Sequence, residues 1–366
     1  MAYTDIDDPS VHFQTALYTG NATQRDITND GNSDLQPDWV WIKCRSAAEA
    51  NMLYDSTRGV TKDLRSDGTA AENTNAQGLQ TFNSNGFQLG TLQNTNFNTK
   101  TMVAWQWKAN GGTATATISE SGNNPAAVVQ ANPTAGFSII TYTGTGASGT
   151  IAHGLGARPK FIIIKNRDAG EGWHINGELL TGNANGGFHF NTDAEYTGGS
   201  NNSTASSIDT NNIHVISSGN VNTNAQKYVA YVFAEKQGYS KFGSYVGNSN
   251  ADGTFVYTGF KPAWIMIKHA GSFGGDQQYA SWGIWDNKRA TSNVVTQATM
   301  LTANNQYQEG NRGNNSSSTL VALDMLSNGF KIRNTSYEVG QSGTYIYMAF
   351  AEHPFVSSEG VPTTAR

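Results

Sequence analysis

Histidine and carboxylate side chains are the groups best suited to metal binding or acid–base catalysis, and in this sequence they are scattered. The 7 histidines include no His-x-x-x-His pair and no His-Glu-x-x-His segment, so the zinc-hydrolase signature is absent. No Gly-x-Ser-x-Gly segment occurs either. The single cysteine, Cys44, excludes an intrachain disulfide and a cysteine-based zinc cluster. These residues predict a protein that is not an enzyme and that uses no metal or cofactor.

One pair of carboxylates has a spacing that catalysis could use. Asp193 and Glu195 lie two residues apart, which places them on one face of a strand. Such a pair is compatible with a glycosidase or with calcium binding, but no Gly-containing calcium loop surrounds it. Solvated surface charge is the simpler interpretation. A polysaccharide-directed activity is the alternative that these two residues leave open.

Aromatic side chains are the better binding candidates, because tryptophan and tyrosine stack on sugars and stabilise protein interfaces. Three tryptophans lie near the middle of the repeats described below, outside the shared strands: Trp173, Trp282 and Trp285. We predict that they contact a partner or receptor. Four others occupy repeated positions and are predicted to be core: Trp39, Trp105, Trp107 and Trp264.

A small basic cluster is the second candidate contact. Arg58, Lys62 and Arg65 fall within twelve residues of one another, in the segment 54–65. Clustered positive charge can form a surface for a partner protein, and a solvated face is the competing interpretation.

The charge balance argues against nucleic-acid and membrane partners. Lys and Arg total 23 against 28 Asp and Glu, a formal net charge of −5, with no dense basic stretch. No apolar run approaches the ~18 residues of a membrane-spanning helix. Only 14% of the 366 residues are charged, and 40 are glycine. Together with short apolar runs such as 161–164, this composition predicts a turn-rich β protein.

Three tandem copies of one unit organise the chain. Each copy has a Tyr-x-Gly turn, then a proline followed six residues later by a lysine that closes an apolar strand. These segments are Pro37–Lys43, Pro159–Lys165 and Pro262–Lys268. Each copy ends in a strand with an aromatic residue at its sixth place, namely Trp107, Phe233 and Phe350. Many short strands separated by turns favour β-sandwich or jelly-roll modules.

We therefore predict an all-β protein with three β-sandwich or jelly-roll-like modules. The modules span 1–108, 133–236 and 237–356, followed by a C-terminal tail at 357–366. Between the first two lies 109–132, rich in Gly, Thr and Ala, which is predicted to be a flexible linker or a β-arm with little core. The second and third modules should form a rigid pair, and the first should be free to reorient.

Several segments resemble a repeat family that is frequent in tail-fibre-like and virion structural proteins of marine bacteriophages, including phages of cyanobacteria. They are Met1–Thr4, Gln36–Lys43, Met52–Gly59, His153–Pro159, Gly238–Tyr245 and Tyr347–Phe355. The resemblance covers nearly the whole chain, from Tyr3 to Phe355, and assigns no catalytic residue.

What the resemblance implies is a non-enzymatic virion subunit, assembled in the host cytoplasm. The leading hypothesis is a tail-fibre or tail-associated surface subunit that contributes to host attachment. Its partners would be other virion proteins, a host surface glycan or protein, and further copies in a homo-oligomer. A capsid decoration or scaffolding protein is one alternative, and a carbohydrate-active or carbohydrate-binding protein is another.

Overall fold

The computed structural model describes residues 2–177, 186–194, 197–198, 208–271, 280–289, 293, 299–310 and 323–363. Within these residues the chain forms antiparallel β-sheets, with one short helix, α1 (Gln93–Asn96), and one 3-10 turn, η1 (Pro9–Val11). The prediction of an all-β fold is confirmed.

The first unit contains strands β1 to β9. Their bounds are β1 (Phe13–Thr19), β2 (Arg25–Thr28), β3 (Trp39–Cys44), β4 (Met52–Asp55), β5 (Lys62–Arg65), β6 (Asn73–Thr74), β7 (Leu79–Asn83), β8 (Gly86–Leu89) and β9 (Thr101–Trp107). The larger sheet has the order β1-β9-β3-β4-β5-β6, and the smaller has the order β2-β8-β7. Buried side chains such as Ile42 and Phe87 fill the space between the two sheets.

The second unit contains strands β10 to β19. Their bounds are β10 (Ala116–Ile118), β11 (Ala127–Asn132), β12 (Phe137–Thr143), β13 (Gly149–Ala152), β14 (Phe161–Asn166), β15 (His174–Asn176), β16 (Gly186–His189), β17 (Thr197–Gly198), β18 (Asn212–Val215) and β19 (Lys227–Phe233). The larger sheet has the order β10-β11-β12-β19-β14-β15-β16-β17, and β13 pairs with β18 in the smaller one.

The third unit contains strands β20 to β27. Their bounds are β20 (Ser240–Gly247), β21 (Phe255–Tyr257), β22 (Phe260–His269), β23 (Gly283–Asp286), β24 (Leu301–Thr302), β25 (Leu323–Leu326), β26 (Gly329–Ile332) and β27 (Gly343–Pro354). The sheets have the orders β20-β27-β22-β23-β24 and β21-β26-β25.

The central strands of the three large sheets share one connectivity. β9 lies between β1 and β3, β19 between β12 and β14, and β27 between β20 and β22. The register also repeats, because the aromatic residue that follows each landmark proline pairs with the aromatic residue of the last strand. These pairs are Trp39 with Trp107, Phe161 with Phe233, and Trp264 with Phe350. The central strand is buried on both faces, which explains its apolar residues at successive positions.

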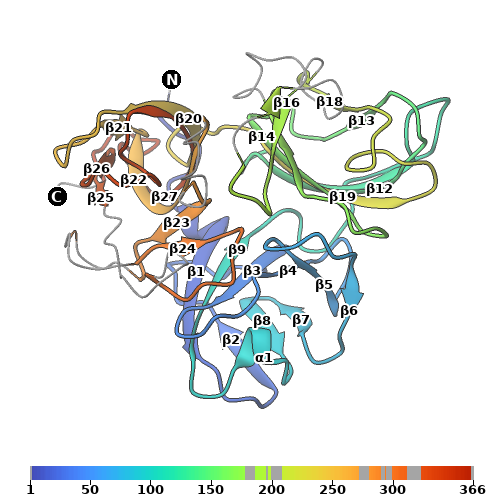
Figure 1. Cartoon of the computed structure of the whole chain (residues 1–366), viewed down its shortest axis with the longest axis horizontal. Coiled ribbons are helices and arrows are strands. Elements are labelled where there is room, and N and C mark those ends of the chain that lie inside the picture. The colour runs from blue at the N-terminus through green and yellow to red at the C-terminus, as the bar shows by residue number, and fades with distance from the viewer. Residues whose placement is uncertain are drawn as a thin grey trace.

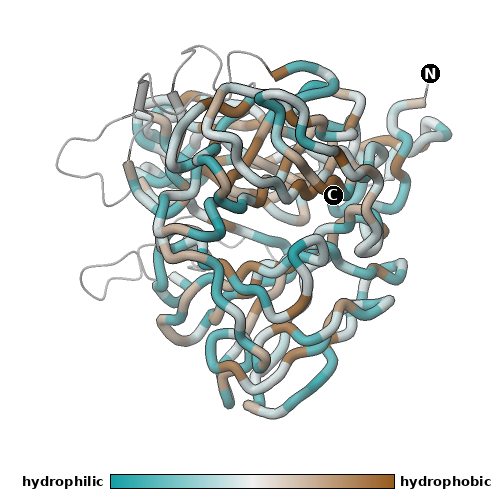
Figure 2. Tube along the Cα trace, turned by 90° about the vertical axis from the view of Figure 1, so that its right-hand side faces the viewer, coloured by the Kyte–Doolittle hydropathy of each residue, from teal (hydrophilic) through white to brown (hydrophobic). Residues whose placement is uncertain are grey.

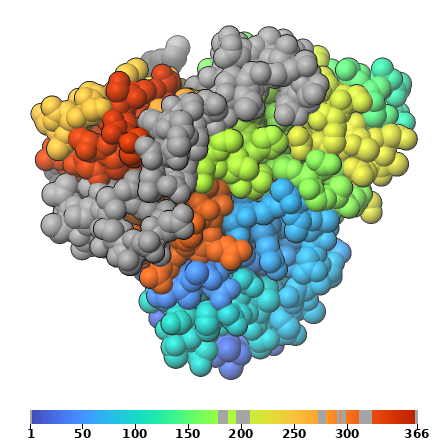
Figure 3. Space-filling view, viewed as in Figure 1, coloured from blue at the N-terminus to red at the C-terminus, as the bar shows by residue number. Residues whose placement is uncertain are grey.

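The three units lie around a common centre (Figure 1), and buried aromatic side chains of all three belong to one core cluster there. Ring contacts join each pair of units, with centroid distances of 4.5 Å for Trp39–Tyr231, 5.4 Å for Trp107–Trp264 and 5.9 Å for Phe233–Phe350. Hydrophobic segments run through the interior in Figure 2, and hydrophilic segments follow the peripheral loops. In Figure 3 the first unit, in blue to cyan, abuts both the green second unit and the orange third unit.

The segment 109–132 is part of the fold, as β10 and β11 of the second sheet. Its start is fixed to the first unit, because the buried Asp38 carboxylate accepts hydrogen bonds from the backbone of Ala109, Gly111 and Gly112 at 2.7 to 2.8 Å. Both glycines have positive φ, 64° and 79°, which lets their N–H groups converge on one anion. The expectation that the first unit reorients freely is therefore wrong.

Candidate functional site

The three tryptophans predicted to contact a receptor are buried within the chain, with exposed fractions of 0%, 1% and 2% for Trp173, Trp282 and Trp285. Trp173 Nε1 donates a hydrogen bond to the carbonyl oxygen of Arg65 in the first unit at 2.8 Å. Trp282 Nε1 donates to the carbonyl oxygen of His189 in the second unit at 3.3 Å. The predicted external contact is wrong for the folded chain, because these rings join or fill the units instead of facing solvent.

The basic cluster is divided by the fold. The Arg58 side chain is buried and forms ion pairs with Asp55 and, at 3.1 Å, with Glu72, so its predicted role as a surface contact is wrong. Lys62 and Arg65 lie at opposite ends of the short strand β5, where Lys62 Nζ donates to Thr74 Oγ1 at 2.6 Å and Arg65 is exposed. Their contact with a partner stays a prediction.

Arg58 belongs to an ionic network across the seam between the first and second units. Glu72 accepts two hydrogen bonds from the Arg167 guanidinium, at 2.8 and 2.9 Å, in the bidentate geometry that favours this pair. On the other side, Tyr231 donates its hydroxyl hydrogen to Asp55 Oδ2 at 2.7 Å. Burial opposes ionisation of Glu72, but the hydrogen bond from Arg167 and the charge of Arg58 lower the pKa of Glu72 below its usual value.

The seam between the third and first units repeats this network with different residues. Arg289 pairs with Asp286 at 2.6 Å and with Glu309 at 3.1 Å, and Glu309 accepts from Arg45 of the first unit at 2.6 Å. Trp105 Nε1 takes the place of the tyrosine hydroxyl and donates to Asp286 Oδ2 at 2.8 Å. The two seams are related by the repeat, because Asp55 and Asp286 pair across their sheets with the equivalent residues of β3 and β22.

Among the residues that the structure describes, the seam between the second and third units has no counterpart of this network. Gly177 occupies the position of Asp55, Met348 occupies the position of Tyr231, and Ala270 occupies the position of Arg45. None of these three positions thus carries a carboxylate or a side-chain donor that could replace the tyrosine or the arginine.

Asp193 lies at the seam between the second and third units. Its carboxylate accepts a hydrogen bond from Ser281 Oγ at 2.9 Å and one from the Asn304 amide, and burial raises its pKa. Asp193 is therefore a structural acceptor rather than a solvated charge. Glu195, its predicted partner for catalysis or calcium, lies outside the described residues.

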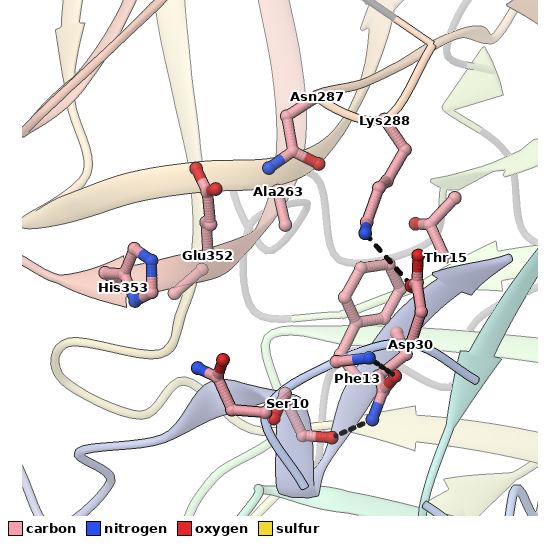
Figure 4. A pocket seen from close by; sticks show the side chains of 13 residues that line it. Ser10, Phe13, Thr15, Asp30, Ala263, Asn287, Lys288, Glu352 and His353 are labelled. Carbon is pink, nitrogen blue, oxygen red and sulfur yellow. Dashed lines mark hydrogen bonds and ion pairs between the residues drawn. The ribbon is translucent and has the colours of Figure 1, made fainter. Parts of the chain in front are cut away.

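A cavity of about 170 Å³ opens at the seam between the first and third units (Figure 4). One side carries Ser10 and Phe13 of the first unit, and the other carries Asn287 and Lys288 of the third. The rest of the lining is Gln14, Thr15, Asp30, Gly31, Asn32, Ala263, Ala351, Glu352 and His353. This cavity is the candidate site, because it is a concave space lined by both apolar and polar groups of two units.

The charged groups of the cavity are already paired. Lys288 Nζ lies 3.0 Å from Asp30 Oδ1 across the mouth, and Glu352 pairs with Lys261 at 2.5 Å. The Thr15 side-chain hydroxyl is also buried, and it has no hydrogen-bond partner among the residues that the structure describes. A buried hydroxyl without a partner costs free energy, so the cavity is suited to a ligand that brings a neutral hydrogen-bonding group.

The cavity residues come from five parts of the chain, near positions 14, 31, 263, 287 and 352, and none was predicted as a site. The sequence signal that could have identified these residues is the repeat, because equivalent positions of the units meet at the seams and Thr15 lies at such a position. Within the described residues, no group of three or more His, Cys, Asp and Glu side chains is arranged to hold a metal ion. In the same part of the chain, no helix has both the length and the apolar character needed to cross a membrane.

Comparison with known proteins identifies one family. The family model described as "Domain of unknown function (DUF7483)" matches residues 8–354, which span all three units. No curated protein and no solved structure matches the chain.

Proposed function

The chain belongs to the DUF7483 family, and we propose that it is a non-enzymatic structural subunit of a bacteriophage virion. Its place would be the tail fibre or another tail-associated surface, where it contributes to host attachment. The proposal starts from the resemblance of segments such as Gln36–Lys43 and Tyr347–Phe355 to repeats of marine phage virion proteins.

One structural observation carries the proposal furthest. Three repeated sheet pairs close around a shared aromatic core, and hydrogen bonds or ion pairs between polar groups join neighbouring units at each of their seams. Such a body is suited to transmit contacts and to display loops, because its buried charges are held in place by partners on both sides. These are the properties of an architectural or attachment subunit.

Immunogold labelling of intact particles with an antibody raised against the chain tests the location. Label confined to the tail or its fibres is the expected result, and label over the whole capsid surface would replace the tail assignment by capsid decoration. Absence of label, with the chain also missing from purified particles by mass spectrometry, would refute a virion role.

Host attachment needs a separate experiment. Adsorption of phage to its host should fall when particles are preincubated with the antibody, and purified chain should bind host cells or a host-surface glycan on an array. Unchanged adsorption together with no binding to cells or glycans would contradict the attachment role while leaving the virion location untouched.

A further inference from the structure

Strand β1 is the edge strand of its sheet, and in the described structure only β9 pairs with it. Hydrogen bonds from Lys108 N to His12 O and from Gly20 N to Lys100 O show that even-numbered residues face β9. The N–H and C=O groups of Phe13, Thr15 and Leu17 therefore point away from β9, since alternate residues of a strand bond to opposite sides. Leu17 leaves 40% of its surface exposed beside this edge.

The same edge is covered in the second unit. There β11 pairs with β12 over six residues, Ala127–Asn132 against Phe137–Tyr142, in antiparallel register. Gln130 of β11 lies opposite Ile139 and enters the seam to the first unit, where its amide donates to Ser56 Oγ at 2.9 Å and to Thr57 Oγ1 at 2.8 Å.

The cavity of Figure 4 lies at the seam between the first and third units, at the place that corresponds by the repeat to the one that Gln130 fills between the second and first. Thr15 corresponds to Ile139, because Phe13 and Phe137 pair with equivalent residues of the central strands. Asn287 corresponds to Ser56, since Asn287 N donates to Ala263 O and Ser56 N donates to Asp38 O, each at 2.9 Å. Thr15, Asn287 and Ala263 all line the cavity.

In the third unit the corresponding edge strand is β20, and neighbouring residues of the same chain hydrogen-bond to its outer edge. On β20 the N–H of Ser240 donates to Lys236 O at 2.8 Å, and that of Phe242 donates to Glu235 Oε2 at 3.3 Å. Thr254 Oγ1 donates to the carbonyl oxygen of Val246 at 2.6 Å. On β1 the corresponding contact is the one from Arg25 to Thr19 O at 2.7 Å, at the far end of the strand from the cavity.

We propose that the outer edge of β1 is a strand-addition site for an extended segment of a partner protein. The segment runs antiparallel to β1 over Phe13–Tyr18, as β11 does on β12, and places a glutamine or asparagine side chain in the cavity. Backbone hydrogen bonds to the free edge supply affinity, and the side-chain pocket supplies specificity.

The chemistry of the cavity selects an amide side chain. Lys288 with Asp30, and Glu352 with Lys261, already neutralise one another, so a charged side chain would enter without a counter-ion. An amide can both donate and accept, and one of the lining residues is Thr15, whose buried hydroxyl has no hydrogen-bond partner in the described part of the chain. The rest of the segment should be uncharged and rich in small and β-branched residues, like β11 itself.

A synthetic peptide of residues 125–134 is the probe, because it carries the β11 sequence with its glutamine. Fluorescence anisotropy of the labelled peptide with the full purified chain should give saturable binding. Replacing the peptide glutamine by alanine should weaken binding about fivefold, the value of one net hydrogen bond. No saturable binding at millimolar concentration, or equal binding of the alanine peptide, would overturn the proposal.

Two proline variants locate the edge. Leu17→Pro removes an outward N–H and places a ring against the added strand while sparing the bonds to β9, so binding should be lost. Ser244→Pro makes the matched change on β20 and should leave binding intact. Thermal unfolding of each variant checks that it folds. Binding retained by Leu17→Pro, or lost only in Ser244→Pro, would contradict the assignment.

Hydrogen exchange keeps the test decisive if Leu17→Pro does not fold. In the unaltered chain, bound peptide should protect the amides of Thr15 and Leu17. Loss of protection at the amide of Gln130, with none gained at Thr15 and Leu17, would mean that the peptide displaces β11, and it would overturn the proposal. Light scattering tests whether a second copy of this chain occupies the edge instead. A dimer that the peptide dissociates would show that the occupant is a second copy, and it would overturn the assignment to a partner protein. The inference goes beyond the virion role, and these measurements on purified chain are independent of particle labelling.

Discussion

Tyr231 of the second unit donates its hydroxyl hydrogen to Asp55 of the first unit, at 2.7 Å between buried atoms. Trp105 and Asp286 make the equivalent contact at the seam between the first and third units, at 2.8 Å. The ring of repeats is therefore held by polar contacts at two seams and by apolar packing at the corresponding position of the third.

Tyr231→Phe should lower the free energy of unfolding by about 1.5–3 kcal/mol, because it removes a hydrogen bond to a buried charged acceptor. Trp105→Phe should cost at least as much, since it also removes ring volume. Met348→Leu makes the matched change at the third seam and should cost less than about 1.5 kcal/mol. Urea unfolding measures all three. Equal effects of Tyr231→Phe and Met348→Leu would show that the hydroxyl contributes nothing net.

Gln130→Ala should also destabilise the chain. The Gln130 side-chain oxygen accepts from the backbone of Asn110 at 3.0 Å and from that of Gly112 at 2.9 Å, in a site that is nearly closed to solvent. The Asn110 N–H loses its acceptor in this variant, whereas Gly112 keeps its hydrogen bond to Asp38, so the substitution should cost about 1–3 kcal/mol in urea unfolding. Gln24→Ala, at an exposed position, serves as the control and should stay within about 0.5 kcal/mol. An unchanged free energy of unfolding for Gln130→Ala would mean that water replaces the amide.

The sequence predicted the strands and their repetition better than it predicted the seams. The pattern of proline, aromatic and lysine marks β3, β14 and β22, because local turn chemistry and apolar patterning specify a strand without reference to other units. The burial of Trp173 could not be predicted in this way. Its partner is the carbonyl oxygen of Arg65, more than a hundred residues earlier in the chain.

The sequence left two alternatives for the segment 109–132, a flexible linker and a β-arm with little core, and the strands β10 and β11 agree with the second. Few large apolar residues occur between positions 109 and 132, so the segment has little core of its own. Its order comes from the β12 edge and from Asp38, neither of which is apparent from local composition. The same comparison of units identifies the open edge of β1, which single-strand patterning does not distinguish from a covered one.

Cys44 should be unreactive in the folded chain. Its thiol is buried on β3 and lies 3.8 Å from the carbonyl oxygen of Thr101, and burial raises its pKa. Because the thiolate is the reactive form, Ellman's reagent should modify Cys44 only as the chain unfolds in urea. Full modification within minutes under native conditions would contradict this placement. Cys44→Ala should show no reaction under either condition.

His174 should make the chain sensitive to acid. Both ring nitrogens are buried and have no hydrogen-bond partner among the described residues, and desolvation, with a smaller repulsion from His189, lowers the pKa of His174 to about 3. The unfolded chain binds this proton near pH 6.5, whereas the folded chain does not bind it until about pH 3. Stability from this group is therefore fully present above pH 6.5 and falls by about 1.4 kcal/mol per pH unit below it.

The His174→Leu variant isolates this contribution to acid sensitivity. It fills the buried site without a titrating group, so its free energy of unfolding should fall less steeply than that of the unaltered chain between pH 6 and 4. Urea unfolding at pH 7.5 gives the packing effect of the substitution alone, which is subtracted from the values at lower pH. Parallel pH profiles for the two proteins would show that His174 accepts a proton in the folded chain as readily as in the unfolded one.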